Sequence, residues 1–210
     1  MIHPQTELRF INDSIGYGVF ATAFIPKGTI VWIMDDLDQQ FDEDYVLNLE
    51  PLRRDSILKY CFRDEQGKYI LCWDIARYVN HSFDSTLIAT PYKLEVAARD
   101  IYPGDEITDD YGYFNLDVPF DCHPEPNSPR TRVMPDDILH FYPEWDRKAA
   151  EAMQYLGQVE QPLAYLIEPM YREKLAAIAA GTAQPDSLLT CYYDRAALAS
   201  SSPCNLGCPH

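Results

Sequence analysis

The chain has 210 residues and carries 17 lysine and arginine side chains against 33 aspartate and glutamate side chains, a formal net charge of −16 at pH 7. This length is typical of one domain with an appendage. The acid excess argues against broad binding to nucleic acid or to an anionic membrane, because both need a positive protein surface. Basic partners are therefore favoured.

The first ten residues, MIHPQTELRF, lack a cationic start followed by an apolar stretch, and no later segment approaches the roughly 18 apolar residues of a membrane span. We therefore expect a soluble chain that is cytoplasmic or otherwise intracellular. The six cysteines are scattered at irregular spacings, which favours reduced thiols over disulfides.

Turn residues divide the first half of the chain into short strands, a pattern typical of a β-rich fold. The segments 18–24 and 29–34 are expected to form a hairpin-like pair around Pro26-Lys27-Gly28. Pro51, at a first helical position, indicates a short helix over 52–60. Further strands are predicted over 68–73, 85–90, 93–99 and 106–108.

The second half changes character after about residue 119, where a proline-rich segment indicates an extended linker. Helical periodicity follows over 144–156 and over 163–180, where Pro169 should start or kink the second half. The sequence therefore predicts a mixed, β-rich α+β domain followed by a helical C-terminal extension.

Three segments place small, polar and aromatic residues where a plain core would have aliphatic ones. Gly16-Tyr17-Gly18 lets the backbone approach a ligand closely or adopt positive φ. Val79-Asn80-His81-Ser82 has three hydrogen-bonding side chains in a row. The third segment, Gly104 to Gly112, ends with Tyr111 beside a glycine. Taken singly, the first also fits a plain turn and the second a loop cap.

In this order and at these separations, the three segments resemble the SET domain, the fold of S-adenosylmethionine-dependent protein-lysine methyltransferases. The resemblance covers residues 6–112 and implies a fold of short strands with a pseudoknot, in which the segment ending at the catalytic tyrosine threads beside the Asn-His pair. It implies that Tyr111 is catalytic. The cofactor-binding residues that it implies are Gly16, Tyr17, Gly18, Asn80, His81 and Tyr111.

In the implied reaction a neutral lysine amine attacks a methyl group on a sulfonium, so the protein must align the reactants and handle a proton. Free lysine has a pKa of about 10.4, and presenting the neutral amine at pH 7 costs about 4.6 kcal/mol. A dry channel and a nearby sulfonium cation both lower that pKa. The apolar ring of Tyr111 suits such a channel, and its hydroxyl can orient both the amine and the methyl carbon.

The chain departs from the family pattern two residues before Tyr111. The family commonly has Phe or Tyr there, at a position linked to the number of methyl groups added, whereas this chain has Asp109. A carboxylate there could bond the incoming ammonium, favour a different degree of methylation, or point to solvent. The degree of methylation therefore stays open.

Many members also continue into a cysteine-rich, zinc-binding post-SET segment. Here Cys122 keeps the first cysteine, but Pro124 and Pro129 stand where the next two would be. A closed zinc site needs four ligands, so we expect no metal, and we expect the helices after 135 to wall the substrate and cofactor. The terminal residues Cys204, Cys208 and His210 are other metal candidates, for which a terminal tail with idle thiols is the favoured interpretation.

These observations divide the chain into a SET domain over 6–112, a degenerate post-SET segment over 113–134, a helical extension over 135–200 and a tail over 201–210. The expected function is methyl transfer from S-adenosylmethionine to a lysine side chain of a basic protein or peptide, with S-adenosylhomocysteine as the other product. Two alternatives remain: a catalytically weak SET-fold module that binds basic partners, and a methyltransferase acting on a small-molecule amine.

The acid excess is also local. Between Arg99 and Asp121 there are seven acidic residues around Tyr111, where a basic peptide would dock. Charge runs are usually solvated faces, but this one predicts that activity on basic acceptors falls as salt is added, because salt screens attraction between opposite charges. The seven residues are Asp100, Asp105, Glu106, Asp109, Asp110, Asp117 and Asp121.

Overall fold

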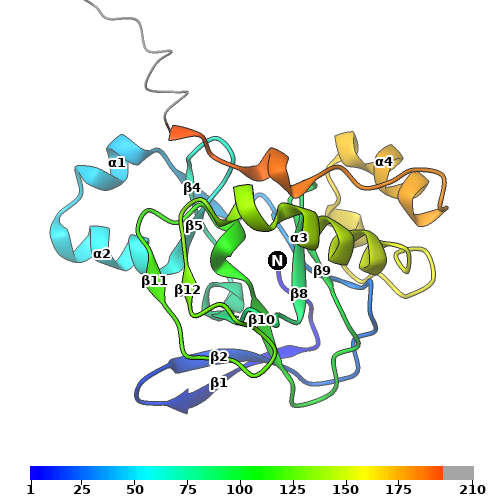
Figure 1. Ribbon diagram of the computed structural model, residues 1–210, viewed down its shortest axis with the longest axis horizontal. Coiled ribbons are helices and arrows are strands. Elements are labelled where there is room, and N and C mark those ends of the chain that lie inside the picture. The colour runs from blue at the N-terminus through cyan, green and yellow to red at the C-terminus, as the bar shows by residue number, and fades with distance from the viewer. Residues whose placement is uncertain (196–210) are drawn as a thin grey trace, which may run out of the picture.

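The computed structural model describes residues 1–195, so Cys204, Cys208 and His210 lie outside the described residues. Most strands lie in the first half of the chain, together with two short helices, and the second half is mainly helical. This arrangement confirms a strand-rich α+β fold with C-terminal helices. In Figure 1, helices α1 (Glu43–Leu47) and α2 (Pro51–Tyr60) lie at one end of the long axis and α4 (Pro169–Ala179) at the other. Helix α3 (Asp137–Met153) lies between them.

The first sheet has four strands in the order β1-β2-β10-β7. Its members are β1 (Thr6–Asn12), β2 (Gly16–Ala21), β10 (Glu106–Asp109) and β7 (Asn80–His81). Strand β10 runs antiparallel to β2 but parallel to β7, with Thr108 opposite Asn80 and Asp109 opposite His81. The strand that leads to Tyr111 therefore runs directly beside the Asn-His pair.

Two three-stranded sheets complete the β structure. One has the order β3-β9-β8, with β3 at Ile30–Ile33, β9 at Leu94–Ala97 and β8 at Leu87–Thr90. The other has the order β4-β6-β5, with β4 at Gln39–Phe41, β6 at Tyr69–Leu71 and β5 at Cys61–Arg63.

The predicted hairpin of 18–24 with 29–34 is wrong, because β2 and β3 belong to different sheets. The segment between them is a crossover. Ile25 exchanges two backbone hydrogen bonds, both of 2.9 Å, with Ile101, and Pro26 has no N–H with which to extend a ladder. The apolar runs were recognised correctly, but their partners are distant in sequence and could not be inferred from the turn.

Two of the helices, α2 and α4, begin at a proline. Helix α2 has Pro51 in its first turn, as predicted, and α4 begins at Pro169 rather than at 163. Helix α3 starts well before the predicted residue 144 and contains Pro143. Its predicted apolar face, which includes Trp145 and Ala149, is buried against the β3-β9-β8 sheet. Met170, predicted to share the apolar face of the second helix, is instead 72% exposed.

The proline-rich linker is also more ordered than predicted. It forms a short hairpin of β11 (Phe120–Asp121) and β12 (Arg132–Val133). The first residues of the chain are built into the fold as well, because Ile2 bridges to Trp32. Within residues 1–195, no helix combines the length and the apolar character needed to cross a bilayer.

Candidate active site

Tyr111 opens a 3₁₀ helix, η2 (Tyr111–Tyr113), directly after β10. Its backbone N–H donates to His81 Nδ1 at 3.1 Å, and its hydroxyl donates to the Val79 carbonyl at 2.7 Å. Burial raises the pKa of this phenol far above its ordinary value, so the hydroxyl stays neutral. Because its proton is engaged by Val79, the hydroxyl has only its oxygen lone pairs left to offer to a ligand.

His81 fixes the backbone at Tyr111. Burial lowers the pKa of His81 to about 4, so the imidazole is neutral near pH 7. Because Nδ1 accepts the Tyr111 N–H, the ring proton is on Nε2, an atom that is buried without a partner. The ring also lies 5.8 Å from that of Phe120, between centroids.

The glycine turn packs against Asn80. Gly16 has φ +85°, a conformation that favours glycine. A Cβ on Gly18 would lie 2.6 Å from Glu106 Oε1 and 2.9 Å from Asn80 Nδ2. Those two atoms are themselves hydrogen-bonded at 2.8 Å, and Asn80 also donates to the Tyr17 carbonyl at 3.1 Å. Gly18 thus makes room for a protein contact that the sequence motif alone did not reveal.

A cavity of about 460 Å³ lies beside Tyr111, within the size range of small-molecule sites. Its walls come from η1 (Ile75–Tyr78), α2, β5 and the chain after β10. None of Gly16, Tyr17, Gly18, Asn80 or His81 lines it. Of the predicted site residues, the structure places Tyr111 in the cavity wall and the Asn-His pair on the neighbouring strand. Aromatic lining residues are Trp32, Tyr60, Phe62, Tyr69, Tyr111, Phe114 and Phe120.

Two buried carboxylates also line this cavity. Asp109 is 3% exposed and Glu95 is 7% exposed, and their side chains are hydrogen-bonded to each other. Tyr113 donates its hydroxyl to Asp109 Oδ1 at 2.8 Å. Burial raises the pKa of Asp109 to about 7, and burial beside Asp109 raises the pKa of Glu95 well above its usual range. The option that Asp109 points to solvent is therefore wrong.

Sequence reasoning missed Glu95. The available signal was a charged residue within the apolar strand Leu94-Glu95-Val96-Ala97, because such residues are almost never fully buried unless they are paired. Its partner, Asp109, lies on a different sheet, so the pairing could not be read from the sequence.

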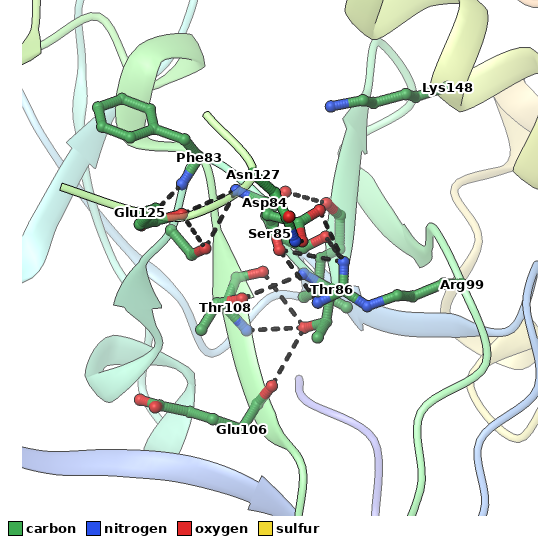
Figure 2. Close-up of polar contacts among 12 residues, drawn as sticks. Phe83, Asp84, Ser85, Thr86, Arg99, Glu106, Thr108, Glu125, Asn127 and Lys148 are labelled. Atoms are coloured by element: carbon green, nitrogen blue, oxygen red, sulfur yellow. Dashed lines mark hydrogen bonds and ion pairs between the residues drawn. The ribbon is translucent and has the colours of Figure 1, made fainter. Parts of the chain in front are cut away.

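Glu125 attaches the β11–β12 hairpin to the turn that follows β7. This carboxylate accepts hydrogen bonds from Ser82 Oγ at 2.9 Å, from Phe83 N at 3.2 Å and from Asp84 N at 3.1 Å. Figure 2 shows Glu125 facing the turn at Phe83 and Asp84, with Asn127 directed at Asp84 as well. The turn to which Glu125 is hydrogen-bonded comes directly after Asn80 and His81.

Arg130 provides a second attachment. Its guanidinium forms ion pairs with Asp110 and, at 2.6 Å, with Asp137 of α3. It also lies over the rings of Phe83 and Phe141, 4.3 Å from each centroid. Because Asp110 accepts the Gly112 N–H and caps η2, Arg130 ties the hairpin to the turn that carries Tyr111.

These contacts correct one expectation about the wall. No described residue after Phe120 lines the 460 Å³ cavity, so the helices after 135 do not wall it directly. Helix α3 contacts the site only indirectly: its Asp137 pairs with Arg130, and Arg130 pairs in turn with Asp110. Residues 1–195 contain no cluster of three or more His, Cys, Asp or Glu side chains suited to a metal ion. The expectation of no metal remains a prediction.

The acidic run around Tyr111 is not one surface. Asp109 and Asp110 are buried and bonded internally, and Asp117 accepts the Tyr69 hydroxyl at 2.6 Å. Asp100, Asp105 and Asp121 are exposed. Any steering of a basic partner would therefore come from fewer charges than the sequence suggested.

This strand-rich domain, with a tyrosine at an aromatic cavity and the Asn-His strand beside it, can be compared with known proteins. Residues 16–112, slightly less than half of the chain, match the family model of the SET domain. Over these residues the chain is therefore similar to a SET domain. A search of curated protein sequences gives no match.

Two solved structures are similar over 52% of this chain. One is ctPRC2 in an autoinhibited conformation bound to S-adenosylmethionine, at 22% identity and a TM-score of 0.43; the match covers 15% of that chain. The other is a Plasmodium falciparum protein assigned as a histone methyltransferase, at 18% identity and a TM-score of 0.39; the match covers 95% of that chain.

Proposed function

We propose that the protein transfers a methyl group from S-adenosylmethionine to the side-chain amine of lysine in a basic protein or peptide. One observation carries the proposal: within a SET domain, Tyr111 lines an aromatic cavity with its hydroxyl proton engaged by Val79 and its lone pairs free. Such an oxygen can accept a hydrogen bond from an incoming amine and orient it.

The residues around the cavity fit a sulfonium cofactor. Aromatic side chains such as Tyr60 and Phe120 favour a cation over their faces, and the carboxylates of Asp109 and Glu95 supply negative charge. The remaining proposed contacts are those of the turn Gly16-Tyr17-Gly18 and of Asn80 and His81. When bound, the cofactor supplies an electrophilic methyl group on a positively charged sulfur.

The residues of this chain then have three tasks. Tyr111 orients the amine through its oxygen; because the phenol stays neutral, it acts as a hydrogen-bond acceptor and not as a base. His81 and Val79 hold Tyr111 in place. The apolar rings of Phe114 and Phe120 line the cavity, and the reduced contact of an entering amine with water there lowers its pKa and favours its neutral, nucleophilic form.

The substrate class follows from charge. A protein with a net charge of −16 favours basic acceptors. One of the similar structures is described as a histone methyltransferase. Core histones are therefore a reasonable first acceptor, together with an array of lysine-containing basic peptides.

The test is transfer of tritiated methyl groups from S-adenosylmethionine to core histones, to the peptide array and to a pool of small amines. We expect label on lysine, and we expect Tyr111→Phe to lose at least 100-fold in kcat/KM while still binding the cofactor. Tyr102→Phe is the matched control, because Tyr102 is 57% exposed and lies outside the cavity. Mass spectrometry of the product counts the methyl groups.

Two outcomes would contradict the proposal. Label found only in the small amines would make the protein a small-molecule methyltransferase. Tight cofactor binding without label in any acceptor, with Tyr111→Phe unchanged, would make it a binding module.

A further inference from the structure

Methylation of lysine near neutral pH requires the arriving ammonium to lose a proton, either to water or to a proton-accepting group of the protein. The motif residues do not provide one. Tyr111 is a neutral phenol whose raised pKa excludes it as a base, and its hydroxyl already donates to Val79. His81 uses Nδ1 to accept the Tyr111 N–H and carries its proton on Nε2. The cavity holds another group that can accept the proton.

Glu95 and Asp109 lie in the right place. They come from β9 and β10, they line the same cavity as Tyr111, and they are hydrogen-bonded to each other. Two buried carboxyl groups that are hydrogen-bonded to each other share one proton, because ionising both would bring two like charges together in a buried site. The pair then carries one negative charge beside Tyr111.

An independent observation indicates that this part of the cavity receives a polar group. Trp32 lies opposite Glu95 in the β3–β9 ladder and is 6% exposed. It lines the cavity too, yet its indole Nε1 is buried without a hydrogen-bond partner. Buried donors are nearly always paired, so an unpaired one here marks a place that a bound polar molecule or water completes.

Three neighbouring acids do not compete for the proton near neutral pH. The pKa values of Tyr111, Tyr113 and Cys72 are all raised, mainly by burial, so these groups stay protonated. Arginine is always charged, and Asp110 is already paired with Arg130. The titratable and charged groups around the pair include Tyr111, Tyr113, Cys72, Asp110, Arg63 and the N-terminal amine, and Lys59, Arg77 and Asp117 line the same cavity.

We propose that the Glu95–Asp109 pair is the general base of the methyl transfer. An N–H bond of the ammonium breaks and an O–H bond forms on the pair, which becomes neutral with two protons. The electron pair stays on nitrogen and then forms the bond to the methyl carbon of the sulfonium donor, whose C–S electrons remain on sulfur. The pair returns the extra proton to water. The inference rests on the proposed function and deepens it.

The kcat/KM of the enzyme should depend on pH through the Glu95–Asp109 pair. The pair is competent only when it holds a single proton. With the pKa of Asp109 raised to about 7, that form becomes dominant as the pH rises through neutrality. The kcat/KM of the wild-type protein should therefore increase between about pH 6 and 8, a limb that belongs to the pair and not to the lysine.

The test compares Asp109→Asn and Glu95→Gln with the wild type, using tritiated S-adenosylmethionine and the array peptide that is labelled most strongly. Each variant is assayed on that peptide and on a copy in which S-aminoethylcysteine, a less basic amine, replaces the lysine. We expect Asp109→Asn to lower kcat by about 100-fold or more on lysine, to abolish the pH limb, and to cost clearly less on the weaker base.

Asp38→Asn is the matched control, because Asp38 is a buried carboxylate, 8% exposed, that does not line the cavity. It should keep both the rate and the pH limb. Thermal melting checks that each variant is folded, and Glu95→Gln decides the matter if Asp109→Asn does not fold.

The outcomes separate this inference from the proposed function. A folded, active wild type whose pH limb survives in both pair variants, or equal losses on the two amines, overturns the role of the pair alone. A wild type that labels no acceptor overturns the proposed function, and the inference with it.

Discussion

The buried pair should cost the protein stability, and replacing Asp109 by Asn should recover it in a pH-dependent way. Asp109 is 3% exposed, and its pKa rises from an ordinary 3.8 to about 7 on folding. The folded state therefore holds a proton that the unfolded state releases, and stability falls as the pH rises from about 3.8 to about 7. Above that range the penalty is constant.

The magnitude follows from the two pKa values. A shift of about 3 units corresponds to roughly 4 kcal/mol at full ionisation. At pH 5 less than half of that penalty has developed, because the folded carboxyl is still protonated. The Asn side chain can still accept the Tyr113 hydroxyl and donate to Glu95. Relative to the wild type, Asp109→Asn should thus gain roughly 2 to 3 kcal/mol between pH 5 and pH 8.

Urea denaturation at a series of pH values measures this gain directly. The control is Asp121→Asn, since the Asp121 side chain is 78% exposed; it should change the free energy of unfolding by no more than about 0.5 kcal/mol at any pH. A difference between wild type and Asp109→Asn that stays flat from pH 5 to 8 would refute the reasoning. A difference of the opposite sign would also refute it, that is, a variant whose free energy of unfolding falls relative to the wild type as the pH rises.

Three further predictions concern the surroundings of the site. Arg130→Ala leaves Asp110 and Asp137 buried without a cation and should cost about 3 to 5 kcal/mol in chemical denaturation, whereas Arg132→Ala, which breaks an exposed pair, should cost under about 1 kcal/mol. Gly18→Ala places a Cβ 2.6 Å from Glu106 Oε1 and should lower both the melting temperature and cofactor affinity; unchanged values in calorimetry would contradict the packing argument. Finally, kcat/KM on core histones should fall several-fold from low to physiological salt, and a flat salt profile would reduce the acid excess to a solubility feature.

Local patterns predicted the elements of this fold well. The apolar runs became β2, β3, β8 and β9, and Pro51 and Pro169 mark the starts of helices. These features depend on neighbours in the sequence, and the chemistry of a proline or a β-branched run acts on its own backbone. The motifs likewise led to Tyr111, which lies in the cavity wall.

Pairing across the chain could not be predicted in the same way. The apolar run at 29–34 pairs with β9 rather than with the strand before it, and Asp109 finds Glu95 on another sheet. The prolines after Phe120 suggested a loose linker, but Glu125 and Arg130 anchor that segment through partners that lie 41 to 43 residues before Glu125 and 20 residues before Arg130. Each of these contacts depends on tertiary geometry that a single sequence does not encode locally.

The two adjacent aspartates before Tyr111 link the Arg130 ion pairs to the Glu95–Asp109 pair. They lie next to each other in the chain, and the charge of Asp110 raises the pKa of Asp109. Arg130 pairs with Asp110 and so offsets the negative charge next to Asp109. Without Arg130, the unpaired charge on Asp110 would push the pKa of the pair higher. Arg130→Ala should therefore shift the pH limb of kcat/KM upward as well as loosening the fold, and a limb that stays in place would show that the two sites act independently.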